Sequence, residues 1–172
     1  MVVTLLQLAA ILAVVVYLGR WRARVRRRNS QTWSSLLARL RPDWSARHLS
    51  EHFLWEEGLD TGLEDTWTRM QGAHGLWAIY QNARVMQEMA DYAARNCPSL
   101  DHELIAALHS DAIQIRLCVL MALGQYAFSQ ASEGVRVNAF RAASMYTGMA
   151  ARMTHLLQEN AASVLPDFVA AM

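Results

Sequence analysis

Residues 2–19, VVTLLQLAAILAVVVYLG, form an apolar run that the basic stretch RWRARVRRR follows at once, at residues 20–28. Only Thr4 and Gln7 are polar within the run. Eighteen helical residues at about 1.5 Å each reach about 27 Å, close to the roughly 30 Å hydrocarbon thickness of a bilayer. The pattern therefore predicts a single transmembrane anchor over residues 1–19.

The basic stretch predicts the orientation of this anchor. Arginine-rich flanks stay on the cytoplasmic side, so we expect the N-terminus outside and the bulk of the chain in the cytoplasm. Each basic side chain near an anionic lipid surface contributes about 1 kcal/mol of attraction, and a tryptophan suits the headgroup level. Residues 20–30 form the predicted juxtamembrane segment. Its expected lipid contacts are Arg20, Trp21, Arg22, Arg24, Arg26, Arg27 and Arg28.

A cleaved secretory signal is the alternative explanation of an apolar N-terminal run. Such a signal carries its positive charge before the apolar region and small residues at the cleavage site after it. Here the arginines come after the run, and Tyr17-Leu18-Gly19-Arg20 is a poor cleavage site. The order of charges favours an uncleaved anchor.

The rest of the chain is acidic and is long enough for one domain. Residues 20–47 hold nine arginines against one acid, Asp43, whereas residues 48–172 hold seven arginines against fourteen acids. This acidic body argues against nucleic-acid binding. All sixteen basic residues are arginine, which indicates a GC-rich and hence bacterial genome, so the expected location is the bacterial inner membrane. Cys97 and Cys118 lack a CxxC spacing, and free thiols are expected in the cytoplasm.

Short amphipathic helices are predicted for residues 31–58. Apolar residues follow the helical i, i+3, i+4, i+7 spacing, and Pro42 ends the first helix. A second short helix is expected from Asp43 to about Glu57. Two placements of the first helix stay open, in the membrane interface or on the bundle that follows. Its apolar residues, the candidate partner contacts, are Trp33, Leu36, Leu37 and Leu40.

Residues 59–172 predict a helical bundle. Three long helices are expected at about 63–96, 101–131 and 135–163, with Pro98 and Pro166 just beyond two of their ends. No stretch alternates with the two-residue period of a strand, so the fold class is all-α. Short turns between long helices predict an up-down antiparallel bundle of three long helices plus one or two short ones. The expected inner faces are Trp67, Met70, His74, Trp77, Ala78, Gln81, Val85, Met89 and Tyr92 on the first helix, and Phe140, Ala143, Thr147, Ala150, Met153 and Leu157 on the last.

The middle long helix is apolar on every side from Leu117 to Gly124. A second membrane span is one interpretation, but Gln114, Arg116 and Gln125 bracket too short a run. We therefore expect the middle long helix to be the central, most buried helix of the domain. On that expectation an aspartate at Leu120 unfolds the domain, because an unpaired buried carboxylate costs several kcal/mol.

One short motif has a catalytic counterpart. His48-Leu49-Ser50-Glu51-His52 is H-x-x-E-H on a predicted helix, where His48 and His52 share a face and could bind zinc. Over these five residues the chain resembles the zinc-binding motif of inverzincin peptidases, which implies a third ligand downstream on a mixed α/β fold. Glu133 is the nearest candidate, but it falls in a predicted turn of an all-α chain. A solvated or interfacial histidine pair is the preferred interpretation.

A second motif, Ala73-His74-Gly75-Leu76, resembles the A-H-x-L around the phosphoryl-accepting histidine of phosphotransfer bundles. The lysine and glycine that usually follow are Trp77 and Ala78 here, so His74 is interpreted as a core histidine. Glu-x-x-His pairs for a di-iron site are missing, as are glycine-rich phosphate loops. We expect no catalytic residue, no metal and no cofactor.

These observations predict a non-enzymatic, membrane-anchored helical-bundle subunit that docks onto, stabilises or helps assemble a larger bacterial membrane protein complex. The expected partners are an integral membrane protein complex and anionic lipid headgroups, without nucleic acid. A membrane-tethered signalling or phosphotransfer bundle using His74 is the first alternative. A zinc-dependent hydrolase at His48 and His52 is the second.

Overall fold

The structure is a computed structural model that describes residues 31–41 and 66–171, apart from 69, 98–99 and 130–131. All regular elements in this part of the chain are helical, which confirms the all-α prediction for it. The anchor at 1–19, the basic segment at 20–30 and the second short helix lie outside the described residues. The elements are α2 (Trp33–Leu37), α5 (Ala73–Asn96), α6 (His102–Ser129), α7 (Glu133–Asn160), the 3-10 helix η1 (Ala162–Val164) and α8 (Leu165–Ala171).

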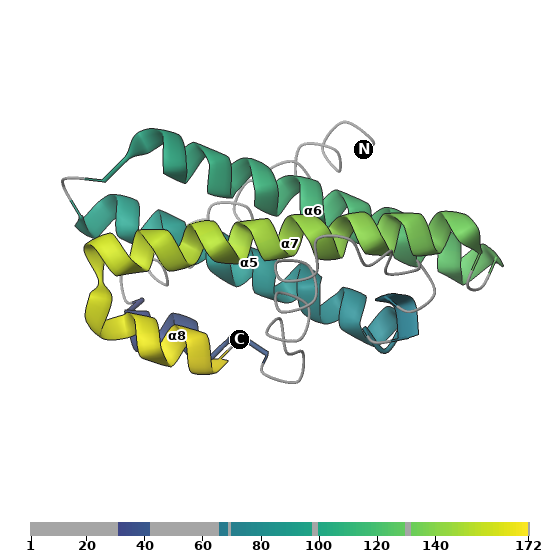
Figure 1. The fold of residues 1–172 in the computed structure, drawn as a ribbon, viewed down its shortest axis with the longest axis horizontal. Helices are drawn as coiled ribbons and strands as arrows, with labels where there is room; N and C mark the ends of the chain where they lie inside the picture. The colour runs from purple at the N-terminus through teal and green to yellow at the C-terminus, as the bar shows by residue number, and fades with distance from the viewer. Residues whose placement is uncertain (1–30, 42–65, 69, 98–99, 130–131, 172) are drawn as a thin grey trace, which may run out of the picture. The chain divides into compact units, whose positions relative to one another are not determined.

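Three long helices make the bundle, as the sequence predicts. Helix α5 has 24 residues, and α6 and α7 have 28 each, which at 1.5 Å per residue gives about 36–42 Å. Short connections join α5 to α6 and α6 to α7, so neighbouring helices run in opposite directions, and Figure 1 shows α7 lying along both of the others. At the start of α6, the carboxylate of Asp101 accepts a hydrogen bond from the Glu103 backbone N–H at 2.8 Å.

The first long helix is shorter than the prediction of residues 63–96. The backbone turns at Gln71 (φ 57°) and Gly72 (φ 62°), and α5 begins only at Ala73. A Cβ atom on Gly72 would lie 3.1 Å from the Trp67 ring, so glycine suits both the left-handed backbone and the close approach. The break uncouples the helical phase of the residues before it from that of α5.

The phase of α5 therefore differs from the predicted one. Met70, Ala78, Val85 and Met89 are buried as expected, but His74 and Trp77 are exposed. Other residues of α5 face the core in their place: Leu76, Ile79, Asn82, Ala83, Met86, Ala90 and Ala93. On α7, four of the six predicted inner residues are buried, namely Ala143, Thr147, Met153 and Leu157.

The C-terminal end differs from the single helix predicted to reach residue 163. Helix α7 ends at Asn160, and the chain turns through η1 into α8. Pro166 is the second residue of α8, where a proline is tolerated because its missing N–H has no partner within the helix anyway. This reversal of the chain brings Phe168 into the common core, where its side chain is 1% exposed.

Helix α2 packs on the bundle, which decides between the two placements that the sequence leaves open. Leu36, Leu37 and Leu40 are buried in the core, against α5 and α8. Trp33 meets Tyr92 of α5 edge to face, with ring centroids 4.8 Å apart. These leucines thus contribute to the stability of the chain's own fold.

The expectation that α6 is the most buried helix is wrong. Leu117, Leu120 and Met121 are each about half exposed, at 54%, 49% and 48%. Helices α5 and α7 cover only one side of α6, so an aspartate at position 120 would reach water. The apolar residues on the other side of α6 remain without a cover within the described part of the chain.

Candidate functional site

The first candidate surface is the uncovered side of α6, which we call the α6 face. Its residues follow helical spacing from Ile113 to Phe128, a length of about 22 Å. Phe128 is 95% exposed. No charged side chain of the described residues lies on this stripe. The α6 face comprises Ile113, Leu117, Leu120, Met121, Gly124 and Phe128.

Two charged residues of α6 beside this stripe, Asp111 and Arg116, contact the neighbouring helices instead. Asp111 forms an ion pair with Arg152 of α7. Arg116 donates hydrogen bonds to the Tyr80 hydroxyl at 3.2 Å and to the Gln87 side chain at 3.4 Å, both on α5. These contacts fix which side of α6 faces outward. Single exposed apolar residues are ordinary, whereas a contiguous stripe of them is typical of a contact surface.

The segment His102–Phe128 is also long and apolar enough to cross a membrane, judged by length and composition alone. Core helices of soluble proteins pass the same test, but they are mostly buried, and only 33% of this apolar window is buried. The polar contacts of Asp111 and Arg116 join α6 to the bundle. Most residues of this apolar window of α6 therefore lie outside the buried core.

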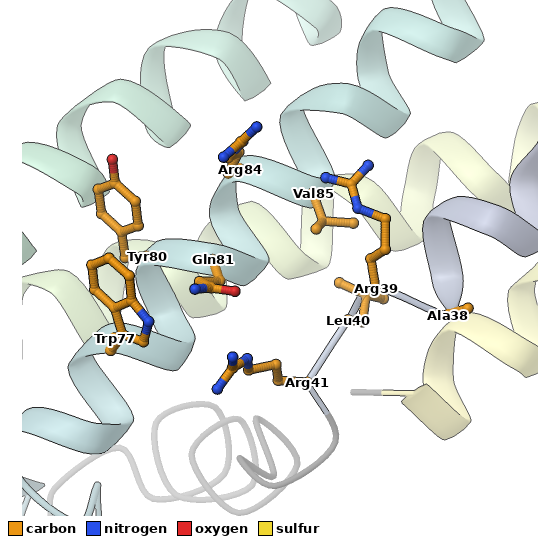
Figure 2. A pocket seen from close by; sticks show the side chains of 9 residues that line it. All are labelled: Ala38, Arg39, Leu40, Arg41, Trp77, Tyr80, Gln81, Arg84 and Val85. Atoms are coloured by element: carbon orange, nitrogen blue, oxygen red, sulfur yellow. The ribbon is translucent and has the colours of Figure 1, made fainter. Parts of the chain in front are cut away.

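The second candidate surface is a cleft between the end of α2 and the middle of α5, with a volume of about 580 Å³ (Figure 2). Figure 2 shows Arg39 turning toward Arg84 and Val85, while Arg41 extends on the side of Gln81 and Trp77. Three of the lining residues are arginines. The cleft is lined by Ala38, Arg39, Leu40, Arg41, Trp77, Tyr80, Gln81, Arg84 and Val85.

A buried amide fixes one wall of this cleft. Asn82 is 0% exposed, accepts a hydrogen bond from the Arg41 backbone N–H at 2.9 Å, and donates to the Arg41 carbonyl at 3.4 Å. Its amide nitrogen also lies 3.1 Å from the hydroxyl of buried Tyr146. Burial raises the pKa of Tyr146, although the hydrogen bond to Asn82 opposes this. The chain after α2 is thus held to α5 through one side chain.

Glu88 neutralises part of the positive charge beside the cleft. Arg39 contacts both carboxylate oxygens, at 2.5 and 3.2 Å, and Arg84 Nε donates to one at 3.3 Å. Burial alone would raise the pKa of Glu88, but the hydrogen bonds and charges of the two arginines outweigh it and hold that pKa below its usual value. The hydrogen bond to Glu88 raises the pKa of Arg39 in turn.

An aromatic pair forms the opposite wall. The rings of Trp77 and Tyr80 are stacked, 5.1 Å apart and 2° from parallel. The guanidinium of Arg116 lies 5.0 Å from the centre of the Tyr80 ring and bonds its hydroxyl. Tyr80 is fixed between these groups, and Trp77, at 42% exposed, presents its ring to solvent at the cleft.

The sequence-predicted site residues fall in different places. His48 and His52 lie outside the described residues, as do the lipid-contact candidates at 20–28. Within the described part of the chain, no three His, Cys, Asp or Glu side chains gather closely enough to bind a metal ion. Glu133 is exposed in the first turn of α7, not in the predicted turn before it. Cys97 and Cys118 are free thiols.

The structure changes the interpretation of His74 and of the candidate partner contacts on α2. His74 is exposed near the start of α5, so the core-histidine interpretation is wrong. The candidate contacts Leu36, Leu37 and Leu40 are buried in the chain's own core. Trp33 is half-buried against Tyr92.

Sequence reasoning did not find Asn82, Arg41 or Arg84. The only signal was a polar residue, Asn82, four residues after the buried Ala78 on one helical face. The predicted inner face of this helix contained Gln81 and not Asn82, whereas in the structure Asn82 is buried and Gln81 lines the cleft.

Comparisons with protein-family models, with curated proteins and with solved structures found no match for this chain. The chemistry of the α6 face and of the cleft is therefore the basis for assigning a function.

Proposed function

We propose that this chain is a non-enzymatic subunit of a bacterial inner-membrane complex, anchored by residues 1–19 with its helical bundle in the cytoplasm. The bundle docks onto an integral membrane partner and stabilises the complex or helps to assemble it. The single observation that carries this proposal is the uncharged, outward-facing stripe of the α6 face.

The occupant we propose for the α6 face is an apolar helix of the membrane partner. The stripe offers no charge for an ionic contact, so an uncharged helical surface is its chemical complement. At Gly124 no atom of the described residues lies within 4 Å of the place of a Cβ atom, and such a small residue lets a second helix approach closely. The predicted anchor would hold the bundle beside the bilayer, where apolar helices of partner proteins are concentrated.

Affinity purification from native membranes in mild detergent tests this proposal. The wild-type chain should recover a defined set of integral membrane proteins in fixed stoichiometry. The double variant Leu117→Glu with Leu120→Glu should lose them, because two carboxylates on the α6 face cannot be buried against an apolar helix. The matched control Ser144→Glu with Ala151→Glu places the same charge on exposed positions of α7 and should retain them.

The outcome also separates the alternatives. Replacing His48 and His52 by alanine should leave the recovered set intact, since docking needs no metal. Recovery of the chain alone, with equimolar zinc and an activity lost in that histidine variant, would instead support a hydrolase.

One observation favours a second candidate function, phosphotransfer at His74. The imidazole is exposed, as a phosphoryl acceptor has to be. Trp77 and Ala78 still replace the lysine and glycine of the motif. Incubation with the phosphoryl donor acetyl phosphate, compared between wild type and His74→Gln, decides this: acid-labile phosphate lost in the variant would favour phosphotransfer over docking.

A further inference from the structure

Among the described residues, none compensates the positive charge that Arg41 brings to the cleft. Its backbone N–H and carbonyl are both held by buried Asn82, so the point where its side chain begins is fixed. Within the described part of the chain, the Arg41 guanidinium has no hydrogen-bond or ion-pair partner. Figure 2 shows this side chain extending beside Gln81, whose amide also lacks such a partner among the described residues.

The charges that the described residues bring to the cleft do not cancel. Glu88 accepts hydrogen bonds from Arg39 and from Nε of Arg84, so one carboxylate is shared between two guanidinium groups. The terminal nitrogens of Arg84 have no partner of their own among the described residues. Among the described residues, three arginines against one glutamate leave an excess of positive charge in a cleft of about 580 Å³. Guanidinium groups bind the oxygens of phosphates in a bidentate manner.

The third feature is the apolar wall. The Trp77 ring is 42% exposed and is stacked on Tyr80, which Arg116 holds from a second helix. A free inorganic anion has no apolar surface to bury against this ring, whereas the carbon skeleton of an ester can pack on it.

We propose that this cleft binds a phosphate ester, with the phosphate at Arg41 and Arg84, the amide of Gln81 as a further donor and the esterified group against Trp77. This inference goes beyond the proposed docking role and does not rest on it, because the α6 face is a different surface.

The phosphate ester has two possible sources, a phospholipid headgroup and a soluble metabolite. The sequence bears on this choice. Twelve residues lie between Arg28 of the predicted juxtamembrane segment and Arg41, and five of them form the helix α2. The thirteen steps from Arg28 to Arg41 therefore span at most about 35 Å, at about 1.5 Å for each helical residue and about 3.4 Å for each of the others. A headgroup of the same leaflet is thus within reach of the cleft, while a soluble ester would meet the same phosphate chemistry.

The experiment uses the full chain in neutral detergent and two probes. Glycerol 1-phosphate represents a soluble ester and is titrated by calorimetry. Vesicles of phosphatidylcholine, with and without phosphatidylglycerol, represent the lipid and are assayed by flotation. Arg41→Gln and Arg84→Gln are compared with Arg95→Gln, which removes an equal charge from the exposed last turn of α5. All variants keep the arginines of residues 20–28.

We expect Arg41→Gln to weaken binding of one probe about tenfold, because a charge-assisted contact to phosphate is lost, and Arg95→Gln to change it less than twofold. Thermal unfolding of Arg41→Gln should match the wild type, since its guanidinium has no partner among the described residues to lose. An effect on glycerol 1-phosphate identifies a soluble ester, and an effect only on phosphatidylglycerol vesicles identifies a headgroup. Equal losses for Arg41→Gln and Arg95→Gln with both probes, or no binding of either, would overturn the proposal.

Discussion

The amide of Asn82 and the backbone of Arg41 form a reciprocal pair of hydrogen bonds between residues 41 positions apart in the sequence, at 2.9 and 3.4 Å. Tyr146 on α7 adds a third contact to the same amide. This arrangement joins the chain after α2 to α5 and α7 at one buried point. It also sets the position from which Arg41 reaches the cleft.

Asn82→Ala is expected to destabilise the fold by about 3 kcal/mol, because the Arg41 backbone N–H and carbonyl lose the amide that pairs with both of them, and the Tyr146 hydroxyl loses one hydrogen bond, in an environment with little water. Urea unfolding followed by circular dichroism measures this change. The control Asn96→Ala removes an exposed amide that, among the described residues, bonds the Tyr92 carbonyl alone, and it should cost less than about 1 kcal/mol. Equal costs for the two variants would contradict the role assigned to Asn82.

Leu120→Asp should fold, because position 120 is half exposed and its carboxylate can stay in water. Leu108→Asp, twelve residues earlier on the same helix, should unfold the bundle. Its side chain is 0% exposed, and an unpaired buried carboxylate costs several kcal/mol of a total near 5–15. Thermal melts of the two variants compare them directly. Loss of helicity in Leu120→Asp would show that the α6 face is covered within the chain.

Glu88 should make stability depend on acid pH. Burial opposes its ionisation, but Arg39 and Arg84 hold its folded-state pKa below the ordinary value near 4.3, so the unfolded chain binds this proton more readily. Its stabilisation is complete above the ordinary pKa and is lost as pH falls through the folded one. The wild type should therefore melt above Glu88→Gln at pH 7, and the gap should close below about pH 4. A gap that is constant from pH 7 to 3 would exclude the ionic contribution.

The predicted topology is tested separately, because it concerns residues outside the described part of the chain. A reporter that works only in the cytoplasm should be active when it is fused after Met172. Replacing the six arginines of residues 20–28 by glutamine should mix the two orientations, since the charge bias is then gone. Activity of a periplasm-only reporter at the same point would contradict the orientation.

Helical periodicity and turn residues were sufficient to predict an all-α bundle with three long helices, because these signals are local. The phase of α5 was not predictable in the same way. Gln71 and Gly72 interrupt the helix, and a glycine in a helical pattern gives only a weak sign of a break. The partner of Asn82 is equally non-local, since Arg41 belongs to another segment.

The α6 face shows a different limit of sequence reasoning. A helix that is apolar all round is expected to be buried, but the sequence does not say by what. In the described part of the chain, α5 and α7 cover one side of α6, and the residues around Leu117 and Leu120 lie on the other side, about half exposed. Which apolar residues of α6 lie outside the core depends on how α5 and α7 pack against it, and the sequence of α6 alone does not give this packing.

The central claim, that the α6 face docks on a membrane partner, is tested most directly by photocrosslinking in living cells. A benzophenone amino acid is placed at Leu117 on the α6 face, and in a matched strain at Ala151 on the exposed side of α7. We predict that position 117 crosslinks to one integral membrane protein and that position 151 does not. No crosslink at 117 to any membrane protein, or the same crosslink from both positions, would contradict the claim.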